Sequence, residues 1–297
     1  MKTPACATSI LLALLLPLSA VVSAAGNIRN IYLFKDVMVS NTTAITTSGF
    51  NSLVIFGVGV LANGDIMYYS NTAGSKDVVV ASGGRYVGGA ALQAKVRSLK
   101  SGPGSTVDRL EICMNSNNVR ELMANPGPGN NTNVYRNFAA LKAAWNLDAV
   151  NNNDEAIYEL SSTVTFAKML GTMGYKYAAS PYTYMSFYQN LLRELNKGLA
   201  EKDWLLDRMY LQCYDGGAGN DPHAWQNSLG IKVVPLLWVI NDSKSWYGVS
   251  PAQARSRFSG WAARGKLGGA GYWNEYDIER MGTSYKEYAD VLNSLFP

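Results

Sequence analysis

The stretch from Leu147 to Glu155 reads Leu-Asp-Ala-Val-Asn-Asn-Asn-Asp-Glu, an apolar start that ends in a cluster of amides and carboxylates. This order is typical of a buried strand whose C-terminal end opens into a polar site. Because alternate residues of a strand share a face, we expect Asn151, Asn153 and Glu155 to point the same way. Glu155, the single acid at the end of that row, is the candidate active centre.

Short apolar runs alternate with longer amphipathic segments on both sides of this stretch. Strands are predicted at 31–37, 52–60, 109–114, 147–155, 176–179, 208–214, 232–240 and 269–273, and helices at 90–99, 134–144, 163–173, 184–198, 251–264 and 285–296. The Asn63-Gly64 pair predicts a tight turn after the second strand, and the Gly- and Ser-rich segment 70–89 predicts a loop. Eight strands with helices between most of them predict an α/β protein with a single (β/α)8 TIM barrel.

The first residues of the chain have the pattern of a secretory signal peptide. Lys2 precedes an apolar run from Ile10 to Val22, and small residues end it at Ala24. We therefore expect residues 1–24 to be removed on export and residues 25–297 to form one barrel domain, secreted or, in a Gram-negative organism, periplasmic. No later segment has the about 18 uninterrupted apolar residues of a membrane helix, so no membrane association is expected.

Charge and composition exclude several classes of protein. The net charge of +4 is scattered along the chain, whereas nucleic-acid binding needs a basic stripe. A single histidine, His223, rules out a multi-histidine zinc site, and no Gly-x-Ser-x-Gly elbow precedes it, so we interpret it as a surface or loop residue. Cys113 and Cys213 lie in apolar runs, which favours free buried thiols over a disulfide. We expect no metal, no cofactor and a monomer.

The ends of the predicted strands resemble those of family 18 glycoside hydrolases, the chitinases and their relatives. The segment that begins at Asp148 falls in the frame of the family's Asp-x-x-Asp-x-Asp-x-Glu motif and ends at Glu155, with Asn151 and Asn153 in place of the two inner acids. The family's third-strand motif Ser-x-Gly-Gly corresponds here to Cys-Met-Asn-Ser at 113–116, which departs from it. The resemblance implies the barrel fold and a site at the C-terminal ends of the strands.

Two further strand ends carry the same resemblance. Tyr214 and Asp215 end a strand as the family's Met-x-Tyr-Asp does, with Gln212 where methionine is usual, and Trp273 matches the tryptophan that closes the eighth strand. In that family the tyrosine and aspartate contact the N-acetyl group of the sugar, and an aromatic ring at the position of Trp273 can stack on the sugar's apolar face. The resemblance therefore implies the following substrate-binding residues: Asp148, Asn151, Gln212, Asp215 and Trp273.

The resemblance also implies substrate-assisted hydrolysis beside an N-acetylglucosamine. In this chemistry Glu155 is the acid, while Asn153 and Tyr214 hold the acetamide that attacks the anomeric carbon. Burial of Glu155 among apolar strand residues is expected to raise its pKa toward that task. The implied ligand is an oligosaccharide or polysaccharide that contains N-acetylglucosamine.

The exchange of acids for amides leaves the activity open at this point. Loss of a preorganised charge costs about 2.7–4 kcal/mol of transition-state stabilisation, yet similar family-85 endo-β-N-acetylglucosaminidases use an Asn-x-Glu pair like Asn153 and Glu155. The first hypothesis is a secreted hydrolase, of chitinase or endo-β-N-acetylglucosaminidase type. The second is a non-catalytic chitinase-like lectin or inhibitor on the same barrel, and the third is a barrel that binds another protein through an outer helix.

Overall fold

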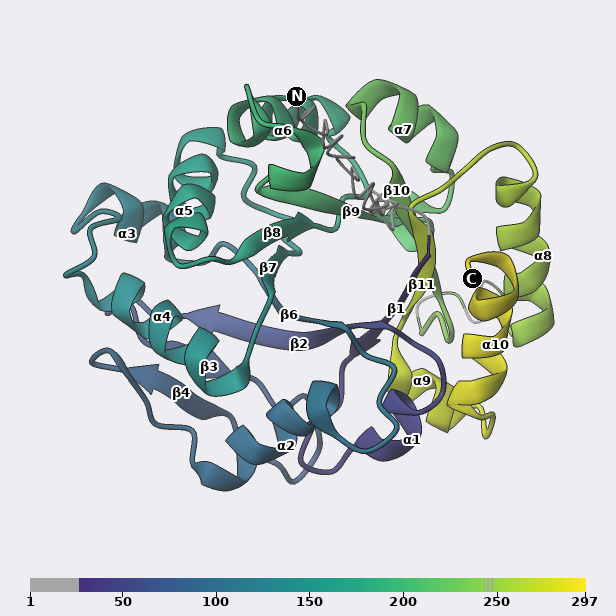
Figure 1. Cartoon of the computed structure of the whole chain (residues 1–297), viewed down its shortest axis with the longest axis horizontal. Coiled ribbons are helices and arrows are strands. Elements are labelled where there is room, and N and C mark those ends of the chain that lie inside the picture. The colour runs from purple at the N-terminus through teal and green to yellow at the C-terminus, as the bar shows by residue number, and fades with distance from the viewer. Residues whose placement is uncertain (1–26, 243, 245, 247) are drawn as a thin grey trace, which may run out of the picture.

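The computed structural model describes residues 27–242, 244, 246 and 248–297. The predicted signal peptide, residues 1–24, lies outside the described residues, and so does Cys6. Within them, eight parallel strands form a closed barrel with helices around it (Figure 1). The barrel strands are β1 (Ile28–Leu33), β2 (Ser52–Val60), β6 (Arg109–Met114), β7 (Ala149–Asn152), β8 (Lys176–Ala179), β9 (Leu206–Gln212), β10 (Val233–Trp238) and β11 (Gly269–Trp273). The predicted (β/α)8 fold is confirmed.

Each barrel strand pairs in parallel with the next one, and β11 pairs with β1 to close the barrel. The first strand lies earlier than the predicted 31–37. It ends at Leu33 because the N–H groups of Phe34 and Lys35 donate to the Glu275 carboxylate, at 2.5 and 2.9 Å, instead of to a neighbouring strand. The fourth strand likewise ends at Asn152 rather than at 155.

An antiparallel extension continues from β2 outside the barrel. It consists of β3 (Ile66–Tyr68), β4 (Val78–Ser82) and β5 (Arg85–Tyr86). The predicted turn after β2 is present, but the prediction of a loop at 70–89 is wrong where β4 and β5 form a hairpin. Gly83 and Gly84, with φ of 58° and 77°, make its turn, since both central residues of such a turn need positive φ.

The helices are α1 (Thr42–Thr46), α2 (Ala90–Ser101), α3 (Val119–Ala124), α4 (Asn133–Trp145), α5 (Leu160–Thr172), α6 (Met185–Asn196), α7 (Pro222–Leu229), α8 (Pro251–Ala262), α9 (Glu275–Arg280) and α10 (Tyr285–Leu295). Helix α7 was not predicted, although its signals are in the sequence: Asp221 caps it, Pro222 follows, and Gly230 ends it at φ 71°. A bilayer-spanning helix is absent from the described part of the chain, because no helix there has the required length and apolarity.

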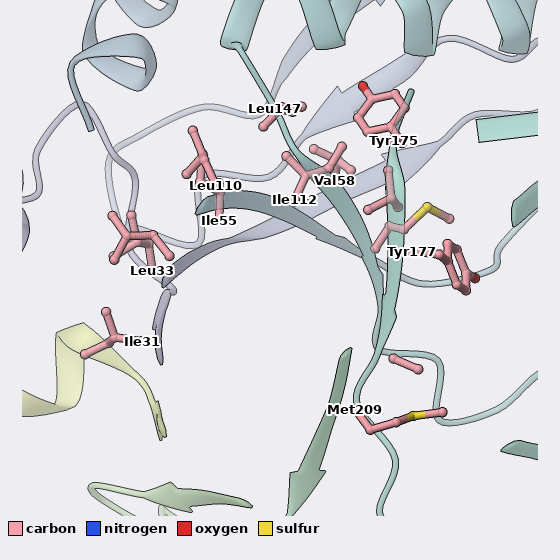
Figure 2. Packing of buried hydrophobic residues seen from close by; sticks show 14 of the residues in the cluster. Ile31, Leu33, Ile55, Val58, Leu110, Ile112, Leu147, Tyr175, Tyr177 and Met209 are labelled. Atoms are coloured by element: carbon pink, nitrogen blue, oxygen red, sulfur yellow. The ribbon is translucent and has the colours of Figure 1, made fainter. Parts of the chain in front are cut away.

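Apolar residues form two clusters, one on each side of the barrel wall. The larger cluster fills the space between strands and helices, and Figure 2 shows part of it, including Ile31 and Leu33 of β1 and Ile112 of β6. The smaller cluster lies inside the barrel and includes Tyr32 and Val54. This inward and outward alternation explains why the strands are almost continuously apolar.

Candidate active site

A cavity of about 720 Å³ opens at the C-terminal ends of the barrel strands. Its volume is in the range of small-molecule binding sites. Six of the predicted site residues line it: Asn153, Glu155, Gln212, Tyr214, Asp215 and Trp273. These residues are separated by up to 120 positions in the sequence, and the barrel brings them together because the C-terminal ends of its strands converge.

Gln212 links the two central residues of the site. Its side-chain Nε2 donates to Asn153 Oδ1 and to Glu155 Oε1, at 3.2 Å each, and to the backbone oxygen of Ser180 at 2.9 Å. Gln212 itself is buried, since only 5 % of its surface is accessible. The amide of Gln212 therefore holds Asn153 and Glu155 as neighbours on the same side of the cavity.

Glu155 lies beyond the end of β7 and is exposed, so the predicted burial among apolar strand residues is wrong. The chain leaves the strand through a turn in which Asp154 Oδ1 accepts the N–H groups of Ala156 and Ile157, at 2.9 Å each. This turn presents Glu155 to the open side of the cavity. Asp154, which also lines the cavity, was missed because a residue between motif positions gives no signal of its own.

Tyr214 contributes a phenol to the cavity. Burial, together with the nearby Glu155 and Cys113, raises the pKa of the Tyr214 phenol well above its usual value. The group therefore stays protonated at neutral pH and can donate a hydrogen bond to a ligand oxygen. Its ring packs against Trp238, with ring centroids 5.7 Å apart.

Aromatic side chains form one wall of the cavity. Trp273 meets Phe56 edge to face, with centroids 4.7 Å apart and an interplanar angle of 89°, and it contacts Tyr32 at 5.3 Å. The indole nitrogen of Trp238 donates to Asp277 Oδ2 at 2.9 Å. These contacts fix the orientation of both indoles, and such fixed rings suit the apolar face of a sugar.

The cavity is electrostatically negative. Asp154, Glu155 and Asp215 line it, while no lysine or arginine is among the described lining residues. The Nζ of Lys244 lies 3.7 Å from Asp215, and both of these side chains are about half exposed. Such a lining favours a ligand that develops positive charge over one that carries phosphate or sulfate.

Solved structures share the barrel fold over about nine tenths of the chain. The catalytic domain of a family GH18 chitinase from the fern Peteris ryukyuensis matches with a TM-score of 0.62 and 14% identity, over 90% of this chain and 98% of that one. A GH18 chitinase from Pseudoalteromonas aurantia matches with a TM-score of 0.61 and 12% identity, over 90% and 99% of the two chains. The chain has the fold of the GH18 chitinases.

A third GH18 chitinase, ChiB from Flavobacterium johnsoniae, matches with a TM-score of 0.58 and 11% identity, over 92% of this chain and 94% of that one. The sequence matches no protein-family model and none of the curated proteins. At such low identity the likeness establishes the fold, so the chemistry of this GH18-type barrel has to be argued from its own residues.

Two of the predicted substrate-binding residues do not line the cavity of this GH18-type barrel. Asp148 precedes β7, at the opposite end of the strand, where Lys100 Nζ lies 2.7 Å from its Oδ2 and the N–H of Leu110 donates to it at 2.7 Å. The motif frame spans the whole strand, which is why its first acid is far from the site. Asn151 lies inside the barrel, beneath the cavity, and is fully buried.

A network of charged and polar side chains fills the barrel interior around Asn151, and sequence reasoning missed it. Glu111 is fully buried, and its Oε1 accepts from Arg109 Nε at 2.7 Å and from the Tyr210 hydroxyl at 2.8 Å. Arg109 also forms a bidentate pair with Asp207, at 2.6 and 2.8 Å. The sequence does contain a sign of this network, because Arg109 and Glu111 are charged residues at alternate positions of the otherwise apolar strand β6.

Of the remaining reactive side chains, Cys113 also lines the cavity, whereas His223 and Cys213 are not among its lining residues. His223 is in the first turn of α7, half-buried, with Nε2 2.8 Å from the backbone oxygen of Trp261. Cys113 and Cys213 are buried free thiols, and burial raises the pKa of both, to about 12 for Cys213. Among the described residues, no group of three or more His, Cys, Asp or Glu side chains is placed to hold a metal ion.

Proposed function

We propose that the protein is a secreted glycoside hydrolase of the chitinase type, which cleaves the β-linkage beside an N-acetylglucosamine. The observation that carries this proposal is the meeting of Glu155, Asn153 and Tyr214 in one cavity, with Gln212 bonded to the first two. Glu155 is the acid and base of the reaction, and Asn153 and Tyr214 hold the acetamide of the sugar.

The reaction proceeds in two steps. In the first, Glu155 gives its proton to the glycosidic oxygen, and the bond between that oxygen and the anomeric carbon breaks while the sugar's own acetamide oxygen bonds to the anomeric carbon. The product is a cyclic oxazolinium ion and a free alcohol. In the second step, water attacks the anomeric carbon, Glu155 takes the proton of that water, and the acetamide is restored with overall retention of configuration.

The electrostatics of the cavity support this chemistry. The oxazolinium ion is positive, and the carboxylates of Asp154 and Asp215 line the space in which it forms. Glu155 is exposed to the cavity, and a bound sugar would exclude water from it. The phenol of Tyr214 supplies a donor for the acetamide oxygen, since its raised pKa keeps it protonated.

A specific observation favours a second candidate function, a sugar-binding protein without turnover. Position 153 carries a neutral amide, whose Oδ1 already accepts from Gln212 at 3.2 Å, so it brings no charge to the positive intermediate. The Asn153→Asp variant separates the two functions. Hydrolysis that is measurable in the variant and undetectable in the wild type would favour the binding protein, because position 153 alone would then be what prevents turnover.

The experiment that tests hydrolysis uses two sets of oligosaccharides of equal length, chitooligosaccharides and their fully deacetylated glucosamine counterparts. Because the acetamide is the nucleophile, we expect cleavage of the acetylated set alone. Chromatography of the products measures the cleavage. Equal cleavage of both sets would contradict the substrate-assisted mechanism. Binding of the acetylated set without any cleavage would replace the hydrolase with the sugar-binding protein.

A further inference from the structure

The carboxylate of Glu111 lies inside the barrel directly beneath the proposed site. Its Oε2 accepts a hydrogen bond from Asn151 Nδ2 at 3.2 Å, and its Oε1 accepts from Arg109 and Tyr210. The Nη1 of Arg208 is 3.8 Å from the same Oε1. Glu111 and Asn151 both have no accessible surface, so no solvent can replace the hydrogen bond between them.

The side chain of Asn151 both donates and accepts hydrogen bonds at this position. It donates through Nδ2 to Glu111, and its Oδ1 accepts from the Ser180 hydroxyl at 2.8 Å and from the Tyr32 hydroxyl at 3.4 Å. An ionised aspartate has no donor, and it would place a second buried carboxylate within about 3 Å of Glu111, where both cannot stay ionised. An amide is therefore the side chain that this surrounding requires.

A continuous set of hydrogen bonds connects this pair to the cavity. Ser180, whose hydroxyl donates to Asn151, offers its backbone oxygen to Gln212 Nε2 at 2.9 Å. The same Nε2 reaches Asn153 Oδ1 and Glu155 Oε1, at 3.2 Å each. A change at Glu111 can thus reach Glu155 through groups that are in direct contact at every step.

We infer that Glu111 is a positioning residue of the site: it fixes the orientation of Asn151, makes an amide obligatory at position 151, and holds Asn153 and Glu155 in place through Ser180 and Gln212. The requirement for an amide at position 151 concerns the stability of the folded protein, so it holds whether or not the protein hydrolyses a sugar. The statement about Glu155 deepens the proposed function and rests on it.

The test is a double-mutant cycle of Asn151→Asp and Glu111→Gln, measured first by thermal unfolding. At pH 8 we expect Asn151→Asp to lower the melting temperature by roughly 10 °C, because it leaves two buried carboxylates in contact. At pH 5 the loss should be less than half as large, since one proton shared by the pair relieves the repulsion. At pH 8 the double variant should lose clearly less stability than the sum of the losses in the two single variants, because the new amide at position 111 can donate to the new carboxylate.

The matched control is Asn196→Asp, another buried asparagine, whose Nδ2 donates to the Leu206 oxygen at 2.8 Å with no carboxylate in this bond. The loss of stability in Asn196→Asp should add to the loss in Glu111→Gln when the two changes are combined, because the two sites do not interact. An Asn151→Asp protein as stable as the wild type at pH 8, or a double variant whose loss of stability equals the sum of the two single losses, would overturn the requirement for an amide.

The positioning claim has its own measurement, the affinity for chitooligosaccharides and the rate of their cleavage at a temperature where every variant is folded. We expect both to fall in Asn151→Asp and to return to within about threefold of the wild type in the double variant. A double variant that loses less stability than the sum of the single losses, but in which affinity and rate do not recover, would overturn the positioning claim. If no variant cleaves the sugar, the proposed function fails, while the stability cycle still decides whether an amide is required.

Discussion

The two halves of the barrel interior contain similar side chains in opposite states. In the lower half, Glu111 is buried and Asp207 is half-buried, and each has an arginine partner within 2.8 Å. In the upper half, Glu155 and Asp215 are exposed to the cavity, and the ion pair of Asp215 with Lys244 is loose, at 3.7 Å. The lower carboxylates have close charged partners within the protein, whereas the upper ones can still accept hydrogen bonds from a ligand.

This difference assigns a role to each half. A buried charge with a complete set of partners is costly to disturb, so the lower half should respond to mutation in stability. A carboxylate that faces a cavity contributes little to folding and much to binding or chemistry, so the upper half should respond in activity.

Removal of Glu111 should have the largest effect on stability. Glu111→Ala leaves Arg208 and the Arg109 Nε without their shared carboxylate, and we expect it to lower the free energy of unfolding by about 3–5 kcal/mol. Glu155→Ala should change it by less than about 0.5 kcal/mol. Denaturant unfolding measures both, and a loss below about 1 kcal/mol in Glu111→Ala would remove the contrast between the halves.

Glu275 is a buried carboxylate at the upper rim, and burial raises its pKa from 4.5 to about 7. A carboxyl with a raised pKa in the folded state stabilises the fold below its unfolded pKa, and this stabilisation is lost as the pH rises through 7. We expect the wild type to lose about 3 kcal/mol between pH 4.5 and 7.5 through this group.

The Glu275→Gln variant tests this pH dependence. Because the amide does not titrate, the variant should show a flatter dependence of unfolding free energy on pH over the same window, even though it is less stable at low pH. Denaturant unfolding at several pH values provides the comparison. Parallel curves for the wild type and the variant would refute the assignment to Glu275.

Tyr214 belongs to the upper half despite its partial burial. Tyr214→Phe removes one donor to the acetamide, and we expect a loss of about 0.5–1.5 kcal/mol in affinity for N-acetylated oligosaccharides with little change in unfolding. Tyr175→Phe is the control, because the Tyr175 hydroxyl donates to the Phe138 oxygen, away from the cavity. Isothermal titration should separate the two, and equal affinities in both variants would exclude Tyr214 from the acetamide site.

Asp148 should have the smallest effect, although it is the first acid of the family motif. Its pair with Lys100 is partly exposed, so Asp148→Asn should cost about 0.2–1 kcal/mol of stability. Affinity and turnover should not change, because Asp148 lies at the other end of β7 from the cavity. A clear loss of sugar affinity in this variant would contradict the placement of the site.

The sequence was sufficient for the fold because its strands are short apolar runs bounded by turn residues. The predicted bounds of β2, β6, β8 and β11 are those of the structure. The end of β1 was not predictable, because it depends on Glu275, which is about 240 residues away. A local sequence pattern indicates that a strand is present, but it does not show where a contact with a distant residue ends that strand.

The candidate site was predicted only in part, for the same reason. Residues at strand ends, such as Tyr214 and Trp273, were placed correctly in the cavity because the barrel brings all such ends together. The contact between Glu111 and Asn151 joins positions 40 residues apart, so the sequence alone did not reveal why an amide stands at 151. The exposure of Glu155 depends on the early end of β7, which the apolar pattern does not mark.

In the proposed function, Glu155 carries out the chemistry in a cavity that binds N-acetylated sugars. The most direct measurement compares the wild type with Glu155→Gln, following the cleavage of a chitooligosaccharide and its binding on the same samples. We predict that the variant binds with similar affinity, unfolds like the wild type and cleaves about 10²–10⁴-fold more slowly. Cleavage by Glu155→Gln at the wild-type rate would contradict the claim.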